Sequence, residues 1–558
     1  MDNIKDKLHN AIKKTLKVNE VNLEISENEN FGDYSSNIAL LGKKRNPRQA
    51  AEHIVNKLKT DKDLLKICDR IEIAGPGFIN FWLKKDVLIN ILKHIDTEKE
   101  NFGKSVKGNG QTVVVDYSAP NIAKPFGIGH LRSTIIGQAL YNLYKELGYE
   151  VIGDNHLGDW GTQFGKLIYM IKEEKPKGLS IEILEKLYVE FHKRAETDPS
   201  LEEKAREWFN KLEKGDLDAK KIWQECVDIS MKEFDKVYQI LGIKIDFAFG
   251  ESYYESEMKS MMEDPAIRRR LMVGEEGAMM VDLSQYGIKT PLMFTKSDGA
   301  TTYATRDLAT IKFRVRKWDP DLIIYEVGAE QTLHFQQVFA AARLLKLVNS
   351  GATLYHTAHG LCLAPDGKKF STRKGKTIKL MEVLDEAIQR AEKLGNNSKV
   401  AKEVGIGAIK YFDLMHSVKS DVVFDWDKMM NLEGNSGPYL QYTVARCNSV
   451  LAKSGNWKTG YLLITDNWKL VTEEEVILRS LVHFSEVIEE AADNFAPNLL
   501  CNYLYDLAQK YNRLYNSCPI LNNSDSEVTN FRLALTASAS QVLKNGLKIL
   551  GIETPERM

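Results

Sequence analysis

One stretch in the first third of the chain constrains its fold more than any other. Residues 112–115, TVVV, form an apolar run typical of a buried strand in a parallel sheet. Apolar side chains then recur at helical spacing over residues 131–147, and a second strand is predicted at residues 150–154, EVIGD. Strand, helix and strand in this order form one unit of a parallel α/β sheet. We therefore expect an α/β domain to be built around this unit.

A glycine-bearing turn, GIGH at residues 127–130, precedes the predicted helix. The N-terminus of a helix presents free backbone N–H groups and the positive end of the helix dipole, so a turn at this place can hold a phosphate. The sequence is neither GxGxxG nor a Walker loop. On the glycines alone, an ordinary α/β crossover and a nucleotide site both remain open.

The composition is that of a large globular protein. The chain has 558 residues, of which 43% are hydrophobic and 27% charged, and this length predicts three or four domains. The formal net charge of −1 gives no overall signal for nucleic acid. The six cysteines are scattered and form no CxxC pair, so neither a disulfide framework nor a zinc site is expected.

The sequence predicts a cytoplasmic protein that does not contact a membrane. Its first residues, MDNIKDKLHNAIKK, lack the apolar core of a signal peptide. No stretch approaches the roughly 18 apolar residues of a membrane helix. A reducing cytosol also fits the unpaired pattern of the cysteines.

The two ends of the chain have different patterns. Residues 1 to about 100 predict a small α/β module, with an amphipathic helix at residues 4–16 and two strands in IEIAGPGFINFWL at residues 71–83. Polar, glycine-bearing residues 98–110 predict a linker. From about residue 427 onward the periods are helical, which predicts a helical bundle and alone says nothing about a partner.

Polar segments follow the predicted strands of the second half. SDGATTYATRD at residues 297–307 leads into a helix, and EQTLHFQQ at residues 330–337 follows the buried run DLIIYEV at residues 321–327. Side chains past the carboxyl end of a parallel strand point into the site crevice. Helix capping is the alternative role for each of them.

A short basic segment, APDGKKFSTRKGK at residues 364–376, carries five basic residues and two glycines. Such a segment is either a solvated hairpin or, opposite a phosphate-binding turn, a lid that closes on polyphosphate.

The segment SAPNIAKPFGIGHLRST, at residues 118–134, resembles the HIGH-motif region of class I aminoacyl-tRNA synthetases, and its framing resembles the arginyl-tRNA synthetase family. The family pattern S-x-P-N-x-A-K-x-x-H-x-G-H-x-R-S is matched from Ser118 to Ser133. Gly127 replaces the first histidine of the pair, and His130, the second, is present. Further resemblances are HLGDWGTQFG at residues 156–165, the Y-x-x-R-D and Q-x-x-H-x-x-Q segments, and KFSTR at residues 369–373 for the KMSKS loop.

This resemblance implies an α/β fold: a Rossmann-like catalytic domain with a parallel sheet and a helical insertion, an N-terminal α/β extension and a C-terminal all-α helical bundle. The implied boundaries are residues 111–425 for the catalytic domain, with the insertion at about 167–290 and the lid loop at 364–378. Residues 1–103 are expected to contact the tRNA elbow, through Phe78 and Asn80. Residues 430–558 are expected to bind the anticodon.

The resemblance also implies arginine–tRNA ligation. L-Arginine and ATP form arginyl-adenylate, and the arginyl group passes to the 3′ end of tRNA(Arg). ATP enters with Mg²⁺ as a substrate complex, no protein-bound metal is expected, and the protein is expected to be a monomer. The implied catalytic residues are His130, Lys124 and Lys369. The implied ATP-binding residues are Gly127, Gly129, His130, His334, Lys369, Ser371 and Arg373. The implied arginine-binding residues are Asp116, which stands where glutamate is usual, Asn121, Tyr303, Asp307 and Gln337.

Three other functions are weighed against this one. A small nucleotidyltransferase with the same turn would lack the long insertion and the helical C-terminal region. A synthetase for another amino acid would need a pocket without Asp307. A non-catalytic tRNA-binding or regulatory relative is suggested by Gly127, but Lys124, His130 and the lid segment are retained. The enzyme is therefore the favoured interpretation.

Overall fold

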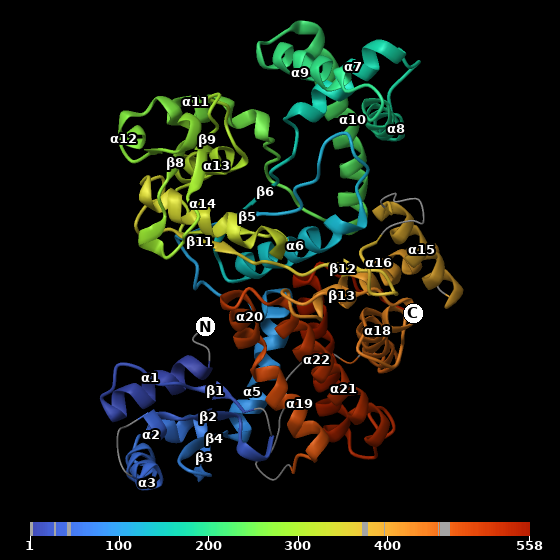
Figure 1. Ribbon diagram of the computed structural model, residues 1–558. Coiled ribbons are helices and arrows are strands. Elements are labelled where there is room, and N and C mark those ends of the chain that lie inside the picture. Colours follow the sequence, from blue (N-terminus) through green and yellow to red (C-terminus); the bar gives the residue numbers. More distant parts are fainter. Residues whose placement is uncertain are drawn as a thin grey trace. The chain divides into compact units, whose positions relative to one another are not determined.

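The computed structural model describes residues 4–26, 29–41, 46–370, 378–395, 397–455, 457 and 469–558. The chain forms two compact units (Figure 1). One consists of Met1–Ser105 together with Asn431–Met558, and the other consists of Val106–Met430. The first unit is therefore built from both ends of the chain.

The unit formed by Val106–Met430, called the central unit below, holds a four-stranded parallel sheet in the order β11-β10-β5-β6. Val113, Val114 and Val115 of β5 are fully buried, which explains their continuous apolar run. The helix that follows, α6, packs on β5 and β6. The predicted strand–helix–strand unit and the α/β class are thus confirmed. The elements are β5 (Thr112–Asp116), α6 (Leu131–Glu146), β6 (Glu150–Asp154), α13 (Tyr303–Trp318), β10 (Leu322–Tyr325), α14 (Thr332–Leu344) and β11 (Thr353–His356).

The expected insertion begins as helices but does not remain helical. Ser180 and Asp216 cap two of the helices through their side chains. A three-stranded antiparallel sheet, β7-β8-β9, follows. The elements are α7 (Thr162–Glu174), α8 (Ile181–Ala195), α9 (Ser200–Glu213), α10 (Leu217–Leu241), α11 (Glu255–Glu263), α12 (Pro265–Arg268), β7 (Met272–Val273), β8 (Met279–Val281) and β9 (Leu292–Thr295).

The remaining elements of the central unit lie before and after the lid segment in the sequence. Two short strands pair in parallel, and helices α15 and α16 pack on each other. Residues 371–377, which form the second half of the predicted lid apart from Ile378, lie outside the described residues. The elements are β12 (Cys362–Leu363), α15 (Leu380–Lys393), α16 (Ser398–Leu414), β13 (Val422–Val423) and α17 (Trp426–Met429).

The N-terminal part of the other unit is an antiparallel sheet, β1-β2-β4-β3, with helices. The predicted hairpin at residues 71–83 is present as β3 and β4 around a turn in which Gly75 and Gly77 have positive φ. The elements are α1 (Ile4–Leu16), β1 (Glu24–Ile25), β2 (Tyr34–Ser36), α2 (Ile38–Leu41), α3 (Pro47–Leu58), α4 (Leu64–Ile67), β3 (Cys68–Ala74), β4 (Phe78–Leu83) and α5 (Lys85–Glu98).

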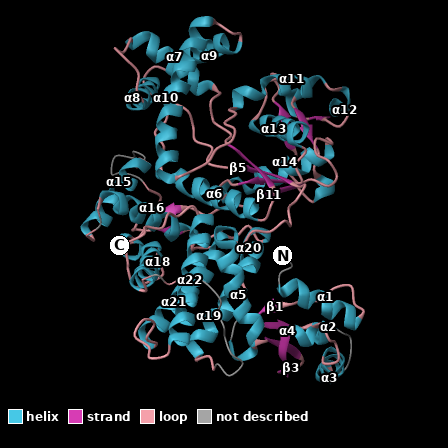
Figure 2. Cartoon of the chain, turned by 180° about the vertical axis from the view of Figure 1, so that it is seen from behind, coloured by secondary structure: helices cyan, strands magenta, loops and turns pink. Residues whose placement is uncertain are grey.

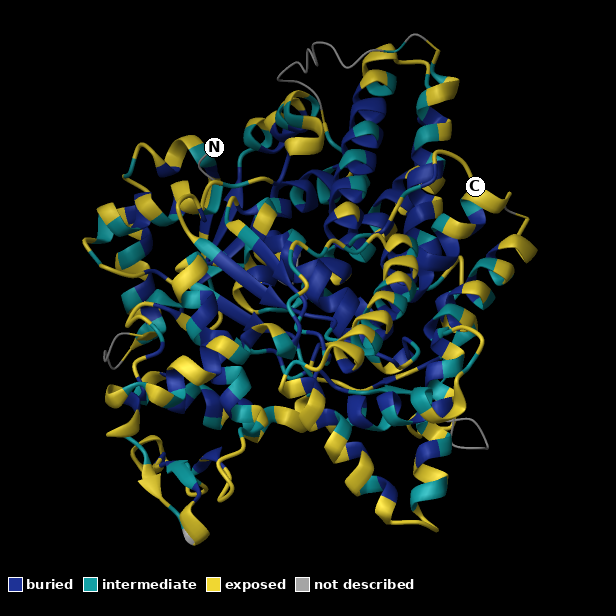
Figure 3. Ribbon diagram, turned by 90° about the horizontal axis from the view of Figure 1, so that it is seen from above, coloured by how far each residue is buried: buried dark blue, intermediate teal, exposed yellow. Residues whose placement is uncertain are grey.

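The C-terminal part of this unit consists of helices joined by loops (Figure 2), as predicted. The helices of this part are α18 (Gly437–Lys453), α19 (Thr472–Val482), α20 (Phe484–Asp493), α21 (Pro497–Ser517) and α22 (Ser526–Ile549). Burial along the chain is coloured in Figure 3. Between Phe531 and Ile549, α22 is buried on nearly all sides, because α18, α19 and α21 pack against it, as a helix at the centre of a bundle requires.

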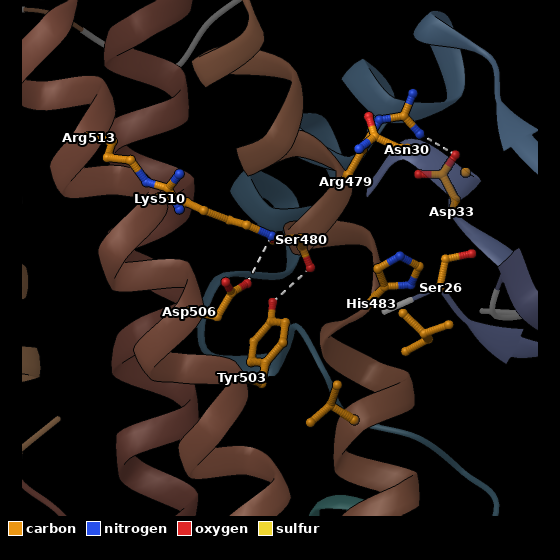
Figure 4. Close-up of a pocket in the computed structure, with 13 residues that line it drawn as sticks. Ser26, Asn30, Asp33, Arg479, Ser480, His483, Tyr503, Asp506, Lys510 and Arg513 are labelled. Atoms are coloured by element: carbon orange, nitrogen blue, oxygen red, sulfur yellow. Dashed lines mark hydrogen bonds and ion pairs between the residues drawn. The ribbon is translucent and has the colours of Figure 1, made fainter. Parts of the chain in front are cut away.

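Buried polar contacts join the two parts of this unit. The guanidinium of Arg479 on α19 pairs with the buried carboxylate of Asp33, and the Tyr34 hydroxyl donates to Glu486 at 2.5 Å. A cavity of about 540 Å³ lies beside these contacts and is lined by His483 and Tyr503 among others (Figure 4). Breaking a buried ion pair leaves an uncompensated charge, so these contacts hold the N-terminal sheet against the bundle.

Candidate functional site

The glycine turn lies between the carboxyl end of β5 and the start of α6, as the short helix η3 (Ile128–His130). Gly127 has φ −86° and ψ 158°, which any residue can adopt. A side chain at Gly129 would meet no atom within 4 Å, so the turn is open at this point. The backbone N–H of Ile128 donates to the carbonyl of Ile378 at 3.1 Å. The turn is therefore hydrogen-bonded to the last residue of the predicted lid loop.

His130 occupies the N-terminal end of α6. Its ring packs edge-on against Phe126 at 5.5 Å between centroids, and a backbone hydrogen bond links it to Ser118. Burial, and then the positive charge of Lys124, lowers the pKa of His130 to about 4. The imidazole is consequently neutral at pH 7, and it can act there as a hydrogen-bond donor without carrying charge.

The two predicted phosphate-binding lysines have other partners in this structure. The Lys124 ammonium lies 5.3 Å from the centre of the Tyr188 ring on α8. The Lys369 ammonium lies 2.5 Å from a carboxylate oxygen of Glu330, and both of these side chains are exposed. Ser371, Thr372 and Arg373 fall outside the described residues.

Helices α13 and α14 bring two predicted site residues together. The Asp307 carboxylate lies 2.5 Å from Nε2 of His334. Tyr303, one helical turn before Asp307, is 72% exposed. The Gln337 side chain, also on α14, donates to the carbonyl of Thr290 at 2.9 Å. Asp307 and His334 were predicted to bind different substrates, and the structure places them in direct contact.

Asn121 contacts a different segment. Its backbone forms an isolated parallel bridge with Gly158. A Cβ at Gly158 would lie 2.5 Å from the amide oxygen of Asn121, so a larger residue there would force the Asn121 side chain to move. The segment HLGDWG thereby supports the loop after β5 that carries Asn121.

Asp116 is engaged inside the sheet, which differs from its predicted direct contact with arginine. Its carboxylate lies 2.9 Å from the Arg314 guanidinium, which also lies 2.7 Å from Asp154. Arg314 is fully buried. Burial raises the pKa of Asp154 and Arg314 opposes that rise. In this structure, Asp116 therefore supports the sheet edge through Arg314.

The Asp159 carboxylate in HLGDWG likewise has a structural partner. It accepts hydrogen bonds from the backbone N–H of Ser252 at 2.9 Å and from its hydroxyl at 2.6 Å. The neighbouring Glu251 pairs with Arg306 at 3.4 Å, and Arg306 directly precedes Asp307. These contacts make the segment a rigid turn, and through Glu251 and Arg306 they help to fix the helix that carries Asp307.

Sequence reasoning missed two buried pairs near the turn. His359 lies 2.8 Å from Glu326, and Arg132 on α6 lies 3.1 Å from Asp413 on α16. Glu326 directly follows the apolar strand β10, and this position at the carboxyl end of a parallel strand was the available signal. The charge of His359 also acts on His130.

The two residues expected to contact tRNA both belong to β4. Phe78 is 40% exposed and available to a partner. Asn80 is 2% exposed, and its amide oxygen accepts a hydrogen bond from Ser35 at 3.0 Å. In this structure Asn80 is held within the sheet, whereas Phe78 presents its ring to the outside.

Among the described residues, no group of three or more His, Cys, Asp or Glu side chains could hold a metal ion. No described helix is both long and apolar enough to span a membrane.

Three family descriptions match successive parts of the chain. Residues 2–83 match the arginyl-tRNA synthetase N-terminal domain, residues 91–426 the catalytic domain of class I tRNA synthetases (R), and residues 440–558 the DALR anticodon-binding domain. The catalytic match covers more than half of the chain. The chain belongs to the arginyl-tRNA synthetase family.

Individual relatives agree with this assignment. The chain is 38% identical to the arginine–tRNA ligase of Fusobacterium nucleatum, with 96% of this chain and 95% of the relative covered. The crystal structure of arginyl-tRNA synthetase from Plasmodium falciparum has 27% identity and a TM-score of 0.84, and both chains are covered completely. The arginyl-tRNA synthetase of Thermus thermophilus, at 22% identity and a TM-score of 0.80, shares the fold over 99% of this chain and all of its own.

Membership of this family makes Gly127 a departure that can be tested. Because the backbone there is ordinary for any residue, we expect Gly127→His to leave the adenylation rate within about threefold of the parent or to raise it, since one donor is added near the phosphates. Single-turnover adenylate formation measures this. Strong inactivation with an unchanged circular dichroism spectrum would contradict the assignment of this turn.

Proposed function

We propose that the protein is an arginine–tRNA ligase that activates L-arginine with ATP and transfers the arginyl group to the 3′ end of tRNA(Arg). The observation that carries the proposal is the similarity to arginine–tRNA ligases along nearly the whole chain. The open turn at the N-terminus of α6 supports it, because such a turn is suited to phosphate.

In the first step, a carboxylate oxygen of arginine attacks the α-phosphorus of ATP. The bond between this phosphorus and the bridging oxygen breaks, and pyrophosphate leaves. In the second step, a terminal ribose hydroxyl of tRNA attacks the arginyl carbonyl, and AMP leaves with the bonding electrons. Both steps need positioning and charge stabilisation and no protein nucleophile.

The residues at the turn have corresponding roles. The neutral imidazole of His130 has one N–H, which donates a hydrogen bond to the phosphates after leaving the Ser118 backbone. Lys124 and Lys369 offset the negative charge that develops on the leaving pyrophosphate, after leaving Tyr188 and Glu330 respectively. ATP enters as its complex with Mg²⁺, which supplies further charge neutralisation.

The arginine pocket is centred on Asp307. Its carboxylate receives the guanidinium, with Tyr303 on the same face of α13 one turn earlier. Asn121 and Gln337 orient the α-amino end. Asp116 contributes through Arg314, with which it is paired.

The proposal extends to the other parts of the chain. Residues 1–103 contact the tRNA elbow through Phe78, and residues 430–558 bind the anticodon arm. The catalytic domain comprises residues 111–425. The enzyme acts as a monomer in the cytoplasm.

Pyrophosphate exchange into ATP tests the proposed function. We expect exchange with arginine and with no other amino acid, when each is assayed with and without tRNA. We also expect charging of arginine tRNA alone. Faster exchange with another amino acid than with arginine would overturn the proposal.

A further inference from the structure

The contact between Asp307 and His334 occupies the carboxylate that the proposed function assigns to the substrate. The distance from Nε2 of His334 to the carboxylate oxygen is 2.5 Å. The His334 side chain is 28% exposed and the Asp307 side chain 20%. Ligands can therefore reach both, while water only partly screens the attraction between them. The imidazole contacts only Oδ2 of Asp307, so a guanidinium that binds both carboxylate oxygens as a fork must displace it.

The charges around this pair favour a cationic imidazole. Burial lowers the pKa of His334, but the hydrogen bond and charge of Asp307 outweigh burial, and the pKa is raised. The neighbouring cations have carboxylate partners of their own. Arg306 lies 3.4 Å from Glu251, and Lys369 lies 2.5 Å from Glu330.

Two further groups interact with the Asp307 charge. They are the carboxylate of Glu251 and the buried hydroxyl of Tyr325. Neither is a cation that could replace the imidazole. Of these surrounding groups, His334 alone supplies Asp307 with a positive partner at contact distance.

We propose that His334 is an affinity-determining residue of the arginine site: as an internal cation it occupies Asp307 until the substrate guanidinium displaces it, and arginine binding thereby expels a proton. The proposal rests on the proposed function, in which Asp307 receives the guanidinium.

The pH dependence follows from the two states of His334. Without arginine, Asp307 keeps the imidazole protonated up to its raised pKa. With arginine bound, the imidazole has lost its partner and faces a second cation, so its pKa falls. Between these two pKa values, binding releases a proton, and arginine affinity therefore rises with pH. Below both values and above both values, the affinity is independent of pH.

The size of the effect is bounded because one proton is involved. Arginine affinity changes by at most tenfold per pH unit inside this window, and by about tenfold for each unit that separates the two pKa values. Arginine itself remains charged throughout, since its guanidinium titrates above about pH 12. The α-amino group of arginine titrates near the upper end of this range, so the part of the proton release that belongs to His334 is the difference between the parent and the His334 variants.

Isothermal titration of the full-length protein with L-arginine tests the proposal, without ATP or tRNA, between pH 6 and 8.5. At each pH, two buffers with different ionisation heats give the number of protons released. For the parent protein, we expect each arginine bound to release up to one proton, and we expect the affinity for arginine to rise with pH. His334→Asn should release fewer protons than the parent, show a flatter profile and bind arginine roughly tenfold more tightly at pH 6.

His356 offers a matched control. This half-buried histidine on β11 lies 2.9 Å from the carbonyl of Val327 and packs on Phe335, which is the neighbour of His334. We expect His356→Asn to keep the parent's proton release and pH profile. His334→Gln provides a second variant. Both His334 variants should bind arginine with the parent's affinity near pH 8.5, and this result would show that the variant proteins are folded.

The outcomes separate this inference from the proposed function. If Asp307→Asn binds arginine as the parent does, Asp307 does not receive the guanidinium, and the arginine pocket assigned under the proposed function is wrong. If Asp307→Asn abolishes binding while His334→Asn keeps the parent's proton release and pH profile, the pocket stands and the role of His334 is refuted.

Discussion

Replacing Asp307 with asparagine is expected to lower arginine affinity about 10²-fold while leaving ATP binding nearly unchanged. Removing one partner of a buried ion pair costs about 3–5 kcal/mol. The Asp307 side chain is 20% exposed, so solvent screening places the effect at the lower end of this range. The proposed ATP site lies at the turn before α6, and no contact described for Asp307 reaches that turn.

Equilibrium titrations with arginine and, separately, with ATP measure the two effects. Asp298→Asn is the matched control, because it makes the same chemical change at an exposed position in the loop before α13, where the carboxylate accepts a hydrogen bond from the N–H of Ala300. The control should bind arginine as the parent does. Unchanged arginine affinity in Asp307→Asn would show that another group receives the guanidinium.

The parts of the fold that the sequence predicts well have long, regular patterns. The valines at 113–115 are fully buried and indicate a parallel strand without ambiguity. The sheet formed by β7, β8 and β9 was not predicted, because strands of two to four residues are too short to display a period. The helical insertion was therefore expected to be more uniform than it is.

For the site residues, the sequence predicts membership of the site better than the contacts within it. A motif identifies which residues gather at a site, but it does not say which of them contact each other. Asp116 was expected to face arginine, and its partner Arg314 comes from a helix far along the chain. The pairing of Asp307 with His334 also depends on how α13 and α14 pack against each other.

The second large effect is expected from Lys124→Ala, which should slow adenylate formation by about 10²–10³-fold. Most class I synthetases carry a second lysine in the lid, and this chain has Thr372 there. Charge still develops on the leaving pyrophosphate, so another cation must stabilise it. Loss of one preorganised charge donor typically costs this amount. Arginine affinity should barely change, because Lys124 acts on the phosphates.

The structure shows how Lys124 is available for this role. Lys124 is exposed, its charge acts on the half-buried ring of His130, and its ammonium lies 5.3 Å from the centre of the Tyr188 ring. A cation–π contact at an exposed site contributes about 0.5–1 kcal/mol, far less than a charged hydrogen bond to phosphate. ATP should therefore draw Lys124 away from Tyr188, and Tyr188→Leu should change the rate by less than about threefold.

Single-turnover adenylate formation distinguishes this role from that of an ordinary surface lysine. Lys186→Ala is the control, because Lys186 is an exposed lysine on the helix that carries Tyr188, and its loss should leave the rate unchanged. Adding Thr372→Lys to the Lys124→Ala protein should restore part of the rate, since it returns a cation to the place where related enzymes have one. A Lys124→Ala protein within about threefold of the parent would refute the role. A slow Lys124→Ala protein that Thr372→Lys fails to rescue would show that Lys124 acts on the α-phosphate side of the turn, near His130, and not on the leaving pyrophosphate.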